Sequence, residues 1–357
     1  MEALFWTAAI FVAYVYVGYP ALLGVWAAIA ARRARPAAPN AGAALPGVSV
    51  IIAARNEAHR LPARIENLLA ADYPVPLEII VASDGSTDQT SEALAPYRDA
   101  VTLLTLPPAG KAAALNAAVA RATHPILVFA DARQRFAADA IRRLAAHFDD
   151  ARTGAVSGGL VIDYDEQGST IGEGVGAYWK YESWLRRREA IVGSTLGVTG
   201  AIYAMRRDLW QPLPPETILD DVLGPMRIVL RGFRVRIEPA ALAFDTAAGD
   251  AATEMRRKIR TLAGNFQLLA AEPRLLLPVV NPVWLQFMSH KVGRLLVPYA
   301  LLAFCAASLV LATRSWFYAA VVGGEVVFAL LAIYGAILDR RGQRVAVNRS
   351  EVVGDAA

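Results

Sequence analysis

Four short apolar runs in the first half of the chain predict the strands of an α/β domain. They cover residues 48–53, 77–82, 101–106 and 125–130. Between the first two runs, Leu61, Ile65 and Leu68 recur at the spacing of one helix face. Strands that alternate with helices form a parallel sheet with helices packed on it. The pattern therefore predicts an α/β fold for this part of the chain.

A charged residue follows each predicted strand. In chain order these residues are Glu57, Asp84, Lys111 and Asp131. Open α/β sheets bind their ligands at the carboxyl ends of the strands, where such residues meet. A lysine suits a phosphate, and a carboxylate with a divalent metal ion suits a diphosphate. The four residues predict a ligand site at this edge of the sheet.

Three long apolar stretches predict helices that cross a membrane. Residues 3–31 and 295–313 carry no charge, and residues 315–338 carry only Glu325. Each is close to or above the ~20 residues that span a bilayer. A cleaved signal peptide is the alternative for the first stretch, but its apolar region would be unusually long. Glu325 is expected to be protonated or paired inside the helix bundle, because an exposed charge there is unfavourable.

The basic residues around these stretches predict the topology. Arg32 and Arg33 follow the first stretch, Lys291 and Arg294 precede the second, and three arginines follow the third. By the positive-inside rule, the amino terminus lies outside, and the α/β domain and carboxyl terminus lie in the cytoplasm. The predicted parts are an anchor (1–33), a linker (34–47), the α/β domain (48–265), interfacial helices (266–291), two transmembrane helices (292–340) and a tail (341–357).

Composition adds limits to this organisation. The chain has 357 residues, of which 55% are hydrophobic, and a net charge of +4. The sole cysteine, Cys305, excludes an internal disulfide. Residues 172–190 predict an amphipathic helix, and its basic run Arg186 to Arg188 is interpreted as a patch that faces solvent or lipid headgroups.

Several motifs resemble those of family 2 glycosyltransferases with the GT-A fold. They are VSVIIAARNE, SDGSTDQT, GKAAALN, FADAR, SGGL, TGAIYAMRRDLW and ILDDVLGPMRIVLRGFRVRIEP, in this order between residues 48 and 239. The resemblance covers roughly residues 48–265. It implies a mixed, mainly parallel sheet, a UDP-sugar donor and one Mg²⁺ or Mn²⁺ ion held with the UDP diphosphate. It also implies a multi-pass protein of a bacterial inner membrane.

The resemblance assigns roles to individual residues. Glu57 and Asp84 would hold the uridine, and Asp88 would support their loop. Lys111 would lie near the diphosphate, and Asp131 would reach it through the metal ion. Asp221 would be the catalytic base. Its neighbour Asp220 would belong to the substrate site and brace the first turn of the helix, and Gly200 would let the backbone approach the substrate closely.

Two departures from the family pattern affect the prediction. Members commonly carry Asp-x-Asp, whereas this chain has Asp131-Ala132-Arg133. Arg133 would either contact the diphosphate directly or pair with Asp131. Processive members carry Gln-x-x-Arg-Trp after the base, and the equivalent segment here keeps only Arg260. The missing tryptophan usually forms part of the acceptor platform, which weakens the case for a polymerase.

The sequence thus predicts an inverting membrane glycosyltransferase for cell-envelope or exopolysaccharide synthesis. The acceptor would be a lipid-linked or polysaccharide hydroxyl, and the partners would be membrane lipids and subunits of an envelope polysaccharide system, with no nucleic acid. Three alternatives stay open. They are a processive β-glycan synthase, a polyprenyl-phosphate glycosyltransferase that needs no hydroxyl-activating base, and a non-catalytic subunit that only binds the nucleotide sugar.

Overall fold

The computed structural model describes residues 1–33, 45–163, 170–246 and 251–354. The predicted linker, 34–47, falls mostly outside these ranges, as do the last three residues of the predicted tail. The chain forms two compact units. The larger comprises residues 20–292, and the smaller comprises residues 1–19 together with 293–357.

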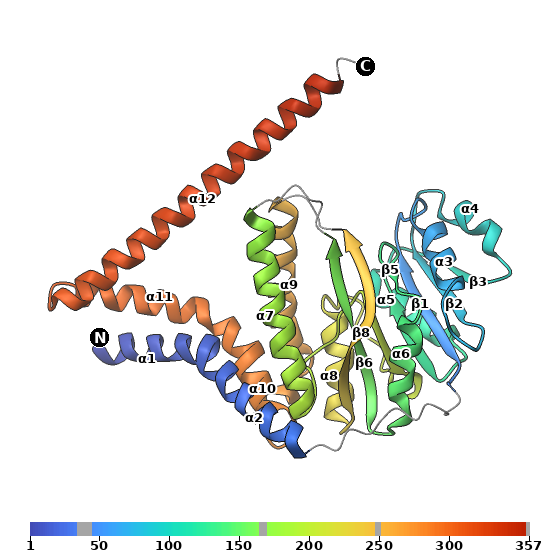
Figure 1. The fold of residues 1–357 in the computed structure, drawn as a ribbon, viewed down its shortest axis with the longest axis horizontal. Coiled ribbons are helices and arrows are strands. Elements are labelled where there is room, and N and C mark those ends of the chain that lie inside the picture. The colour runs from blue at the N-terminus through green and yellow to red at the C-terminus, as the bar shows by residue number, and fades with distance from the viewer. Residues whose placement is uncertain (34–44, 164–169, 247–250, 355–357) are drawn as a thin grey trace. The chain divides into compact units, whose positions relative to one another are not determined.

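An eight-stranded sheet forms the centre of the larger unit (Figure 1). Its strands are β1 (Val48–Ala54), β2 (Glu78–Asp84), β3 (Val101–Leu106), β4 (Ile126–Ala130), β5 (Arg135–Phe136), β6 (Thr153–Asp163), β7 (Ile202–Arg206) and β8 (Arg234–Thr246). They lie in the order β3-β2-β1-β4-β7-β6-β8-β5. The first four are parallel, β7 is antiparallel to β4 and β6, and β8 is parallel to β6 and antiparallel to β5. The predicted mixed, mainly parallel sheet is confirmed.

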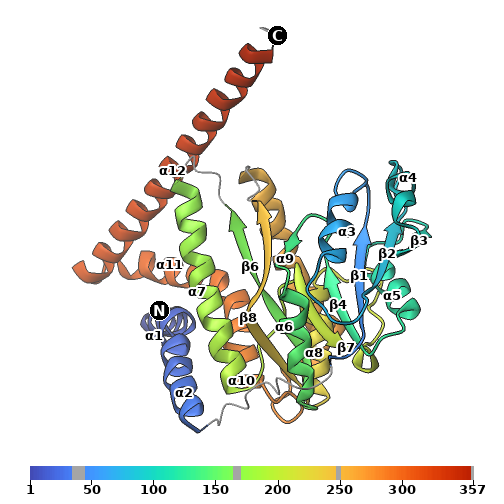
Figure 2. The same ribbon diagram turned by 45° about the vertical axis from the view of Figure 1, so that its right-hand side comes forward.

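Helices cover both faces of the sheet (Figure 2). α3 (Leu61–Leu69), α4 (Thr90–Leu94) and α6 (Ala140–Ala146) pack on one face, and α5 (Lys111–Arg121) and α8 (Asp220–Leu230) pack on the other. Side chains alternate along each strand. Val50 and Ile52 of β1 therefore lie in the core beneath α3, α4 and α6, and Ile51 lies in the core beneath α5 and α8. A strand buried on both faces reads as a continuous apolar run, which explains why these strands were visible in the sequence.

The remaining described helices of the larger unit come from its amino-terminal segment and from the chain after β6. They are α2 (Tyr19–Arg33), α7 (Thr170–Val192), α9 (Ala251–Ala271), α10 (Trp284–Gln286) and the π-helical segment η6 (Phe287–Val292). Short 3₁₀ turns lie at η2 (Ala95–Tyr97), η3 (His147–Asp149), η4 (Arg207–Leu209) and η5 (Pro273–Leu276). Gln267 of α9 accepts a hydrogen bond from the Ile218 amide at 2.9 Å and donates one to the Glu216 carbonyl at 2.8 Å. α9 therefore fixes the loop that leads into α8.

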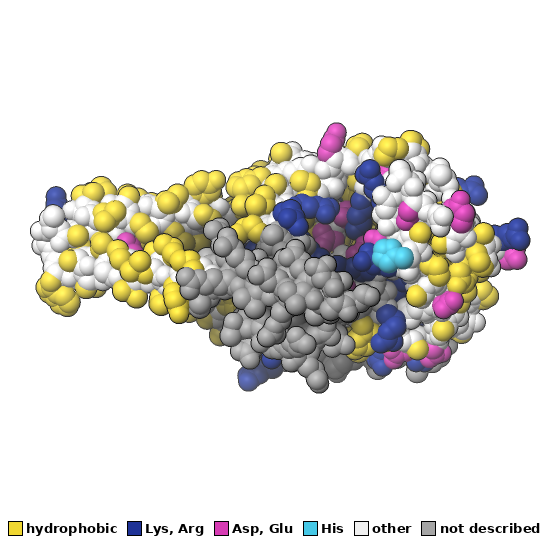
Figure 3. Space-filling view, turned by 90° about the horizontal axis from the view of Figure 1, so that it is seen from above, with side chains coloured by type: hydrophobic (Ala, Val, Ile, Leu, Met, Phe, Trp, Pro, Cys, Tyr) yellow, Lys and Arg dark blue, Asp and Glu magenta, His cyan; other side chains and the backbone are white. Residues whose placement is uncertain are grey.

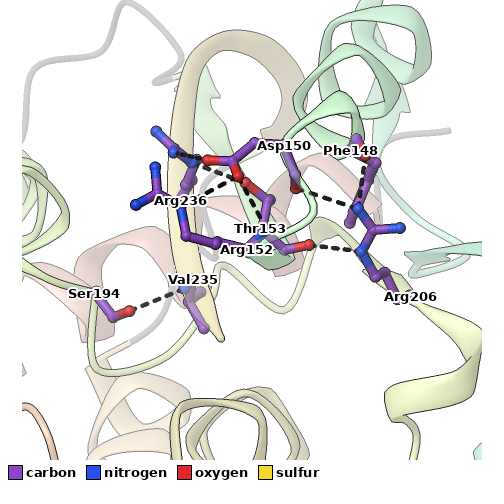
Figure 4. A network of polar contacts seen from close by, with 8 residues as sticks. All are labelled: Phe148, Asp150, Arg152, Thr153, Ser194, Arg206, Val235 and Arg236. Carbon is purple, nitrogen blue, oxygen red and sulfur yellow. Dashed lines mark hydrogen bonds and ion pairs between the residues drawn. The ribbon is translucent and has the colours of Figure 1, made fainter. Parts of the chain in front are cut away.

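A polar network ties β6, β7 and β8 together (Figure 4). Arg236 contacts Asp150 at 2.5 Å and donates to the Thr153 hydroxyl at 2.8 Å. Arg206 donates to the carbonyls of Thr153 at 2.9 Å and Phe148 at 2.6 Å. Arg206 is the last residue of β7, whose first residue, Ile202, pairs with the last residue of β4. The network therefore lies at the opposite edge of the sheet from Asp131.

Among the described residues, three helices are long and apolar enough to cross a membrane, as predicted. They cover Glu2–Arg32, Trp284–Leu311 and Trp316–Gly335. The second begins before residue 295, the predicted start, because the chain is already helical through residues 284–292. The smaller unit contains α1 (Glu2–Ala13), a π-helical turn η1 (Tyr14–Gly18), α11 (Gly293–Leu311) and α12 (Trp316–Gly354).

Aromatic and polar contacts hold the helices of the smaller unit together. Phe5 of α1 stacks on Phe304 of α11 with 4.6 Å between ring centroids. Ser308 of α11 donates a hydrogen bond to the Glu325 carboxyl group of α12, with its Oγ 3.0 and 3.1 Å from the two oxygens. Glu325 therefore has a hydrogen-bond partner inside the bundle, which agrees with one of the two expected states, and its protonation stays a prediction.

Candidate active site

The loops after β1 and β2 are tied to each other at the carboxyl edge of the sheet. Asn56 adopts a positive φ of 57°. Its amide donates to the Ser86 hydroxyl at 3.1 Å, and its side-chain oxygen accepts from the Thr87 amide at 2.8 Å. Asp88 accepts from the Ala58 amide at 2.9 Å, which is the bracing contact expected of it. Glu57 contacts the Arg60 guanidinium at 2.7 Å.

Asp84, at the end of β2, caps the loop after β3. Its carboxylate accepts hydrogen bonds from the amides of Ala109 at 2.7 Å and Gly110 at 3.0 Å. Gly110 has a φ of 91° and Gly85 a φ of 60°, conformations that favour glycine. A Cβ on Gly85 would also lie 2.7 Å from the Pro108 nitrogen. Asp84 thus shapes the loop that leads to Lys111, and its predicted contact with the uracil stays a prediction.

Lys111 links Asp131, which follows β4, to Asp220, the first residue of α8. Its ammonium lies 3.5 Å from Asp131 Oδ1 and 3.3 Å from Asp220 Oδ2. Burial acts to lower the pKa of Lys111, but Asp220, Asp131 and Asp221 outweigh it and raise the pKa above its ordinary value. Lys111, Asp131 and Asp220 line a small cavity together with Gly200 and Tyr203. Figure 3 shows acidic and basic side chains close together on the face seen from above.

Asp221 stands in the first turn of α8, as predicted. Its carbonyl accepts from the Val198 amide at 2.9 Å, and a Cβ on Gly200 would lie 3.2 Å from its Oδ2. Gly200 therefore leaves room for this carboxylate. Burial, together with Asp220, raises the pKa of Asp221 to about 6, against the opposing effect of Lys111, Lys291 and Arg186. A carboxylate with that pKa is suited to general base catalysis near neutral pH.

The SGGL motif supports the backbone segment that contacts Asp221. Gly158 lies at an irregularity in the β6–β8 pairing, where a Cβ would meet the Ala241 carbonyl at 2.7 Å. Only glycine fits so close to the neighbouring backbone. Ser157 accepts a hydrogen bond from the Thr199 amide at 2.9 Å. The motif thereby fixes the 197–200 segment, against which Asp221 packs.

The interpretation of Arg186 to Arg188 as a patch facing solvent or headgroups is wrong for Arg186. Its guanidinium donates to the Thr199 hydroxyl and the Gly197 carbonyl, both at 3.2 Å. Burial lowers the pKa of Arg186, and the acids around it, Glu182 foremost, act to raise it. Arg188 instead lies over the Trp184 ring at 3.8 Å. Sequence reasoning treated the run as one unit, although successive helix residues point in different directions.

Four residues of the site region were missed in the sequence. Glu182 and Glu189 of α7 contact His290 of η6, and Lys291 follows His290 in the chain. The one available signal was the spacing of Glu182, Arg186 and Glu189, which places three charges on one face of a helix. Contacts between residues about a hundred positions apart could not be inferred from that spacing.

Arg133 forms a pair that the sequence did not suggest. It contacts Asp245 of β8 at 2.6 Å and is not paired with Asp131. Asp245 also accepts from Gln134 at 2.9 Å. The alternative contact of Arg133 with the diphosphate stays a prediction. Arg260 is exposed on α9, and no contact among the described residues joins it to the other predicted site residues.

The predicted divalent metal ion fits the structure only if a diphosphate ligand supplies part of its coordination. The described residues contain no group of three His, Cys, Asp or Glu side chains that could hold an ion. Asp131 is 39% exposed at the carboxyl edge. Mg²⁺ is often bound through one or two carboxylates and substrate phosphates. Asp131 could therefore hold an ion that a diphosphate helps to coordinate.

The fold and the carboxyl-edge site define a GT-A glycosyltransferase domain. Residues 49–211 match the model of glycosyl transferase family 2. Over 92% of its length, and 92% of the other chain, it superposes with a TM-score of 0.71 on the mannosyltransferase PcManGT from Pyrobaculum calidifontis, with 25% identity. That structure contains GDP-Man and Mn²⁺.

Curated relatives resemble the same region. The poly-beta-1,6-N-acetyl-D-glucosamine synthase of Staphylococcus aureus (strain COL) is 24% identical over 236 residues, which are 63% of this chain and 56% of the relative. The synthase of the same name from Staphylococcus epidermidis is 22% identical over 231 residues, 62% of this chain and 55% of the relative. The chain thus spans little more than half the length of these relatives.

Proposed function

We propose that the chain is an inverting membrane glycosyltransferase that moves a sugar from a UDP-sugar to a hydroxyl of a lipid-linked or polysaccharide acceptor. The observation that carries this proposal is the position of Asp221: it stands in the first turn of α8, against Gly200 and next to Asp220, which contacts Lys111 at 3.3 Å. Its pKa, raised to about 6, supports the same role. The similarity to polysaccharide synthases supports a cell-envelope or exopolysaccharide product. The three apolar helices support a multi-pass membrane location.

In the proposed reaction, Asp221 acts on the acceptor hydroxyl and Lys111 acts on the donor diphosphate. Asp221 removes the proton of the acceptor hydroxyl, and the oxygen attacks C1 of the sugar from the face opposite the diphosphate. The new C1–O bond forms as the bond from C1 to the phosphate oxygen breaks, and UDP leaves with the electron pair. Lys111 stabilises the charge that develops on the diphosphate.

Asp131 is the residue that would hold a divalent ion at the donor diphosphate. Such an ion would act as a Lewis acid on the departing phosphate. The Mn²⁺ in the PcManGT structure supports an ion of this kind. The basic residues that flank the apolar helices support an inner-membrane protein with the catalytic domain in the cytoplasm, where nucleotide sugars are made. Membrane lipids and subunits of an envelope polysaccharide system are the proposed partners.

The comparisons suggest two donors for the first test. The full chain in lipid nanodiscs is incubated with labelled UDP-N-acetylglucosamine or GDP-mannose and with a membrane lipid extract, and labelled products are separated by size. We expect transfer from the UDP-sugar. A single added sugar would favour the proposed reaction, and a ladder of products would favour the processive alternative. Transfer from GDP-mannose alone would contradict the proposed donor.

Two variants test the base. Asp221→Asn should lower transfer ~10²–10⁴-fold, the usual scale for a lost general base, with UDP binding retained. Asp149→Asn is the matched control, since Asp149 is exposed on η3. Transfer to a hydroxyl at a near wild-type rate in Asp221→Asn would refute the mechanism. Retained transfer to polyprenyl phosphate would favour that alternative acceptor.

A further inference from the structure

A buried histidine on the Asp221 side of the site is clamped between two acids of one helix. His290 is 4% exposed. Its Nδ1 lies 2.7 Å from Glu189 Oε1, and its Nε2 lies 3.1 Å from Glu182 Oε1. Glu182 and Glu189 are seven residues apart in α7, so they lie two turns apart on the same face. Both ring nitrogens therefore join η6 to α7.

The next residue, Lys291, lacks close contacts of this kind with any described acid. Lys291 interacts electrostatically with Glu182, Asp221 and Arg186. Within the part of the chain that the structure describes, no hydrogen bond and no ion pair within 4 Å fixes the Lys291 ammonium. Its place is therefore set by the backbone of η6. Single π-helical turns inside helices often occur at functional sites, because the extra residue redirects side chains.

The 197–200 segment connects this cluster to Asp221. Arg186, which lies between the two glutamates on α7, donates to Gly197 and Thr199. Asp221 packs on the same segment from α8, through Val198 and Gly200. Arg186, which stands on the same helix as the two glutamates, and the candidate base thus contact the same short piece of backbone.

We propose that His290 is a positioning residue for the transfer reaction: the clamp formed by Glu182, His290 and Glu189 fixes the η6 backbone so that Lys291 faces Asp221. The inference rests on the proposed role of Asp221 as the base. The charged groups that act on the pKa of Asp221 are Asp220 of α8, Lys111 of α5, Lys291 of η6 and Arg186 of α7. Glu182 and Glu189 face His290.

The clamp has a measurable consequence for Asp221. Burial raises the pKa of this carboxyl group, and Lys291 acts to lower it. Displacement of Lys291 should therefore raise the pH at which Asp221 loses its proton. A histidine with a purely structural role would leave that pH unchanged.

Infrared spectroscopy can follow this proton without a known acceptor. The full chain in nanodiscs is titrated with acid, and the protonated carboxyl band of Asp221 is identified by its loss in Asp221→Asn. Lys291→Met should raise the midpoint by about one pH unit, the scale of one lost opposite charge. His290→Leu should shift it in the same direction, and the double variant should shift it no further than Lys291→Met alone. Lys291→Arg should keep the wild-type midpoint.

Matched controls come from elsewhere in the chain. Lys258→Met removes an exposed lysine of α9. His147→Leu removes a histidine that contacts Glu238 at 2.8 Å. Neither control should move the Asp221 midpoint, because neither residue is among the charges that act on Asp221.

The outcomes separate this inference from the function on which it rests. An unchanged midpoint in Lys291→Met, or additive shifts in the double variant, would overturn the positioning role. If His290→Leu does not fold, His290→Gln replaces it, and the Lys291→Met result still decides whether Lys291 acts on Asp221. If no Asp221 band titrates near pH 6 in the wild-type protein, the raised pKa that supports the proposed function fails instead.

Discussion

The half-buried Asp221 carboxylate should make the folded protein less stable than its amide variant at neutral pH. Burial raises the pKa of Asp221 from 3.8 to about 6. A pKa difference of one between the folded and unfolded states corresponds to about 1.4 kcal/mol, so a difference of about two corresponds to about 3 kcal/mol. Asp221→Asn removes the charge and keeps the shape. The substitution removes both the cost of burying the charge and its repulsion by Asp220. We therefore expect Asp221→Asn to be more stable than the wild type by up to about 3 kcal/mol.

The sign of the pH dependence follows from proton binding. Between about pH 4 and about pH 6 the folded state holds a proton on Asp221 that the unfolded state has lost. The contribution of Asp221 to stability therefore falls as the pH rises through this range, and it is constant above it. Asparagine does not titrate. The advantage of Asp221→Asn should be absent below about pH 4 and complete above about pH 7.

Thermal unfolding of the full chain in nanodiscs, followed by tryptophan fluorescence between about pH 4 and about pH 8, measures this difference. At about 2–4 °C per kcal/mol for a domain of this size, the midpoint of Asp221→Asn should rise by up to about 10 °C at neutral pH. Asp149→Asn should show no change. Asp220→Asn should lower stability, because Lys111 loses a carboxylate that lies 3.3 Å away.

An equal midpoint for Asp221→Asn and the wild type at every pH would refute this reasoning. It would mean that the Asp221 carboxylate is well solvated, with an ordinary pKa. A gain that does not change with pH would point to improved packing rather than to a removed charge. Either result would also remove the reason to regard Asp221 as a tuned base.

Three further predictions address the donor side and the membrane unit. Chelation should abolish transfer, and Mn²⁺ or Mg²⁺ should restore it; full activity in excess chelator would exclude an ion at Asp131. Arg133→Gln should lower stability by about 1–3 kcal/mol, because Asp245 is 8% exposed and loses a charged partner. The same variant should weaken UDP-sugar binding, measured by calorimetry. Unchanged donor affinity would show that Arg133 does not reach the diphosphate. Ser308→Ala and Glu325→Leu should each weaken the packing of α11 on α12 by about 0.6–1.7 kcal/mol; unchanged expression, unfolding temperature and transfer in Glu325→Leu would leave this contact without a role.

The donor side of the site could be predicted because its residues follow strands that are visible in the sequence. Parallel strands buried on both faces give continuous apolar runs, and their carboxyl ends meet at one edge. Lys111 and Asp131 were expected there, and the structure places them 3.5 Å apart. The pairing of Arg133 with Asp245 was not foreseen, because β8 returns to this edge more than a hundred residues later.

The acceptor side depends on contacts that leave no local pattern. His290 meets Glu182 and Glu189 across more than a hundred residues, and each of these residues alone looks like an ordinary surface charge. Arg186 was misread for the same reason, since its partners are a hydroxyl and a carbonyl of the 197–200 segment. Hydrophobic periodicity predicts which face of a helix is buried, but it does not identify the polar partner that a buried charge finds.

The pairing of β6 with β8 limits how this protein can be divided into fragments. The matched family region ends at residue 211, whereas β8 begins at Arg234 and pairs with β6 along most of its length. A fragment cut after residue 211 would expose the edge of β6 and the core beneath α8. Unpaired strand edges promote aggregation. Expression of the catalytic domain alone should therefore extend at least to η6, so that the sheet is complete and the fragment retains Asp221 and the residues around it.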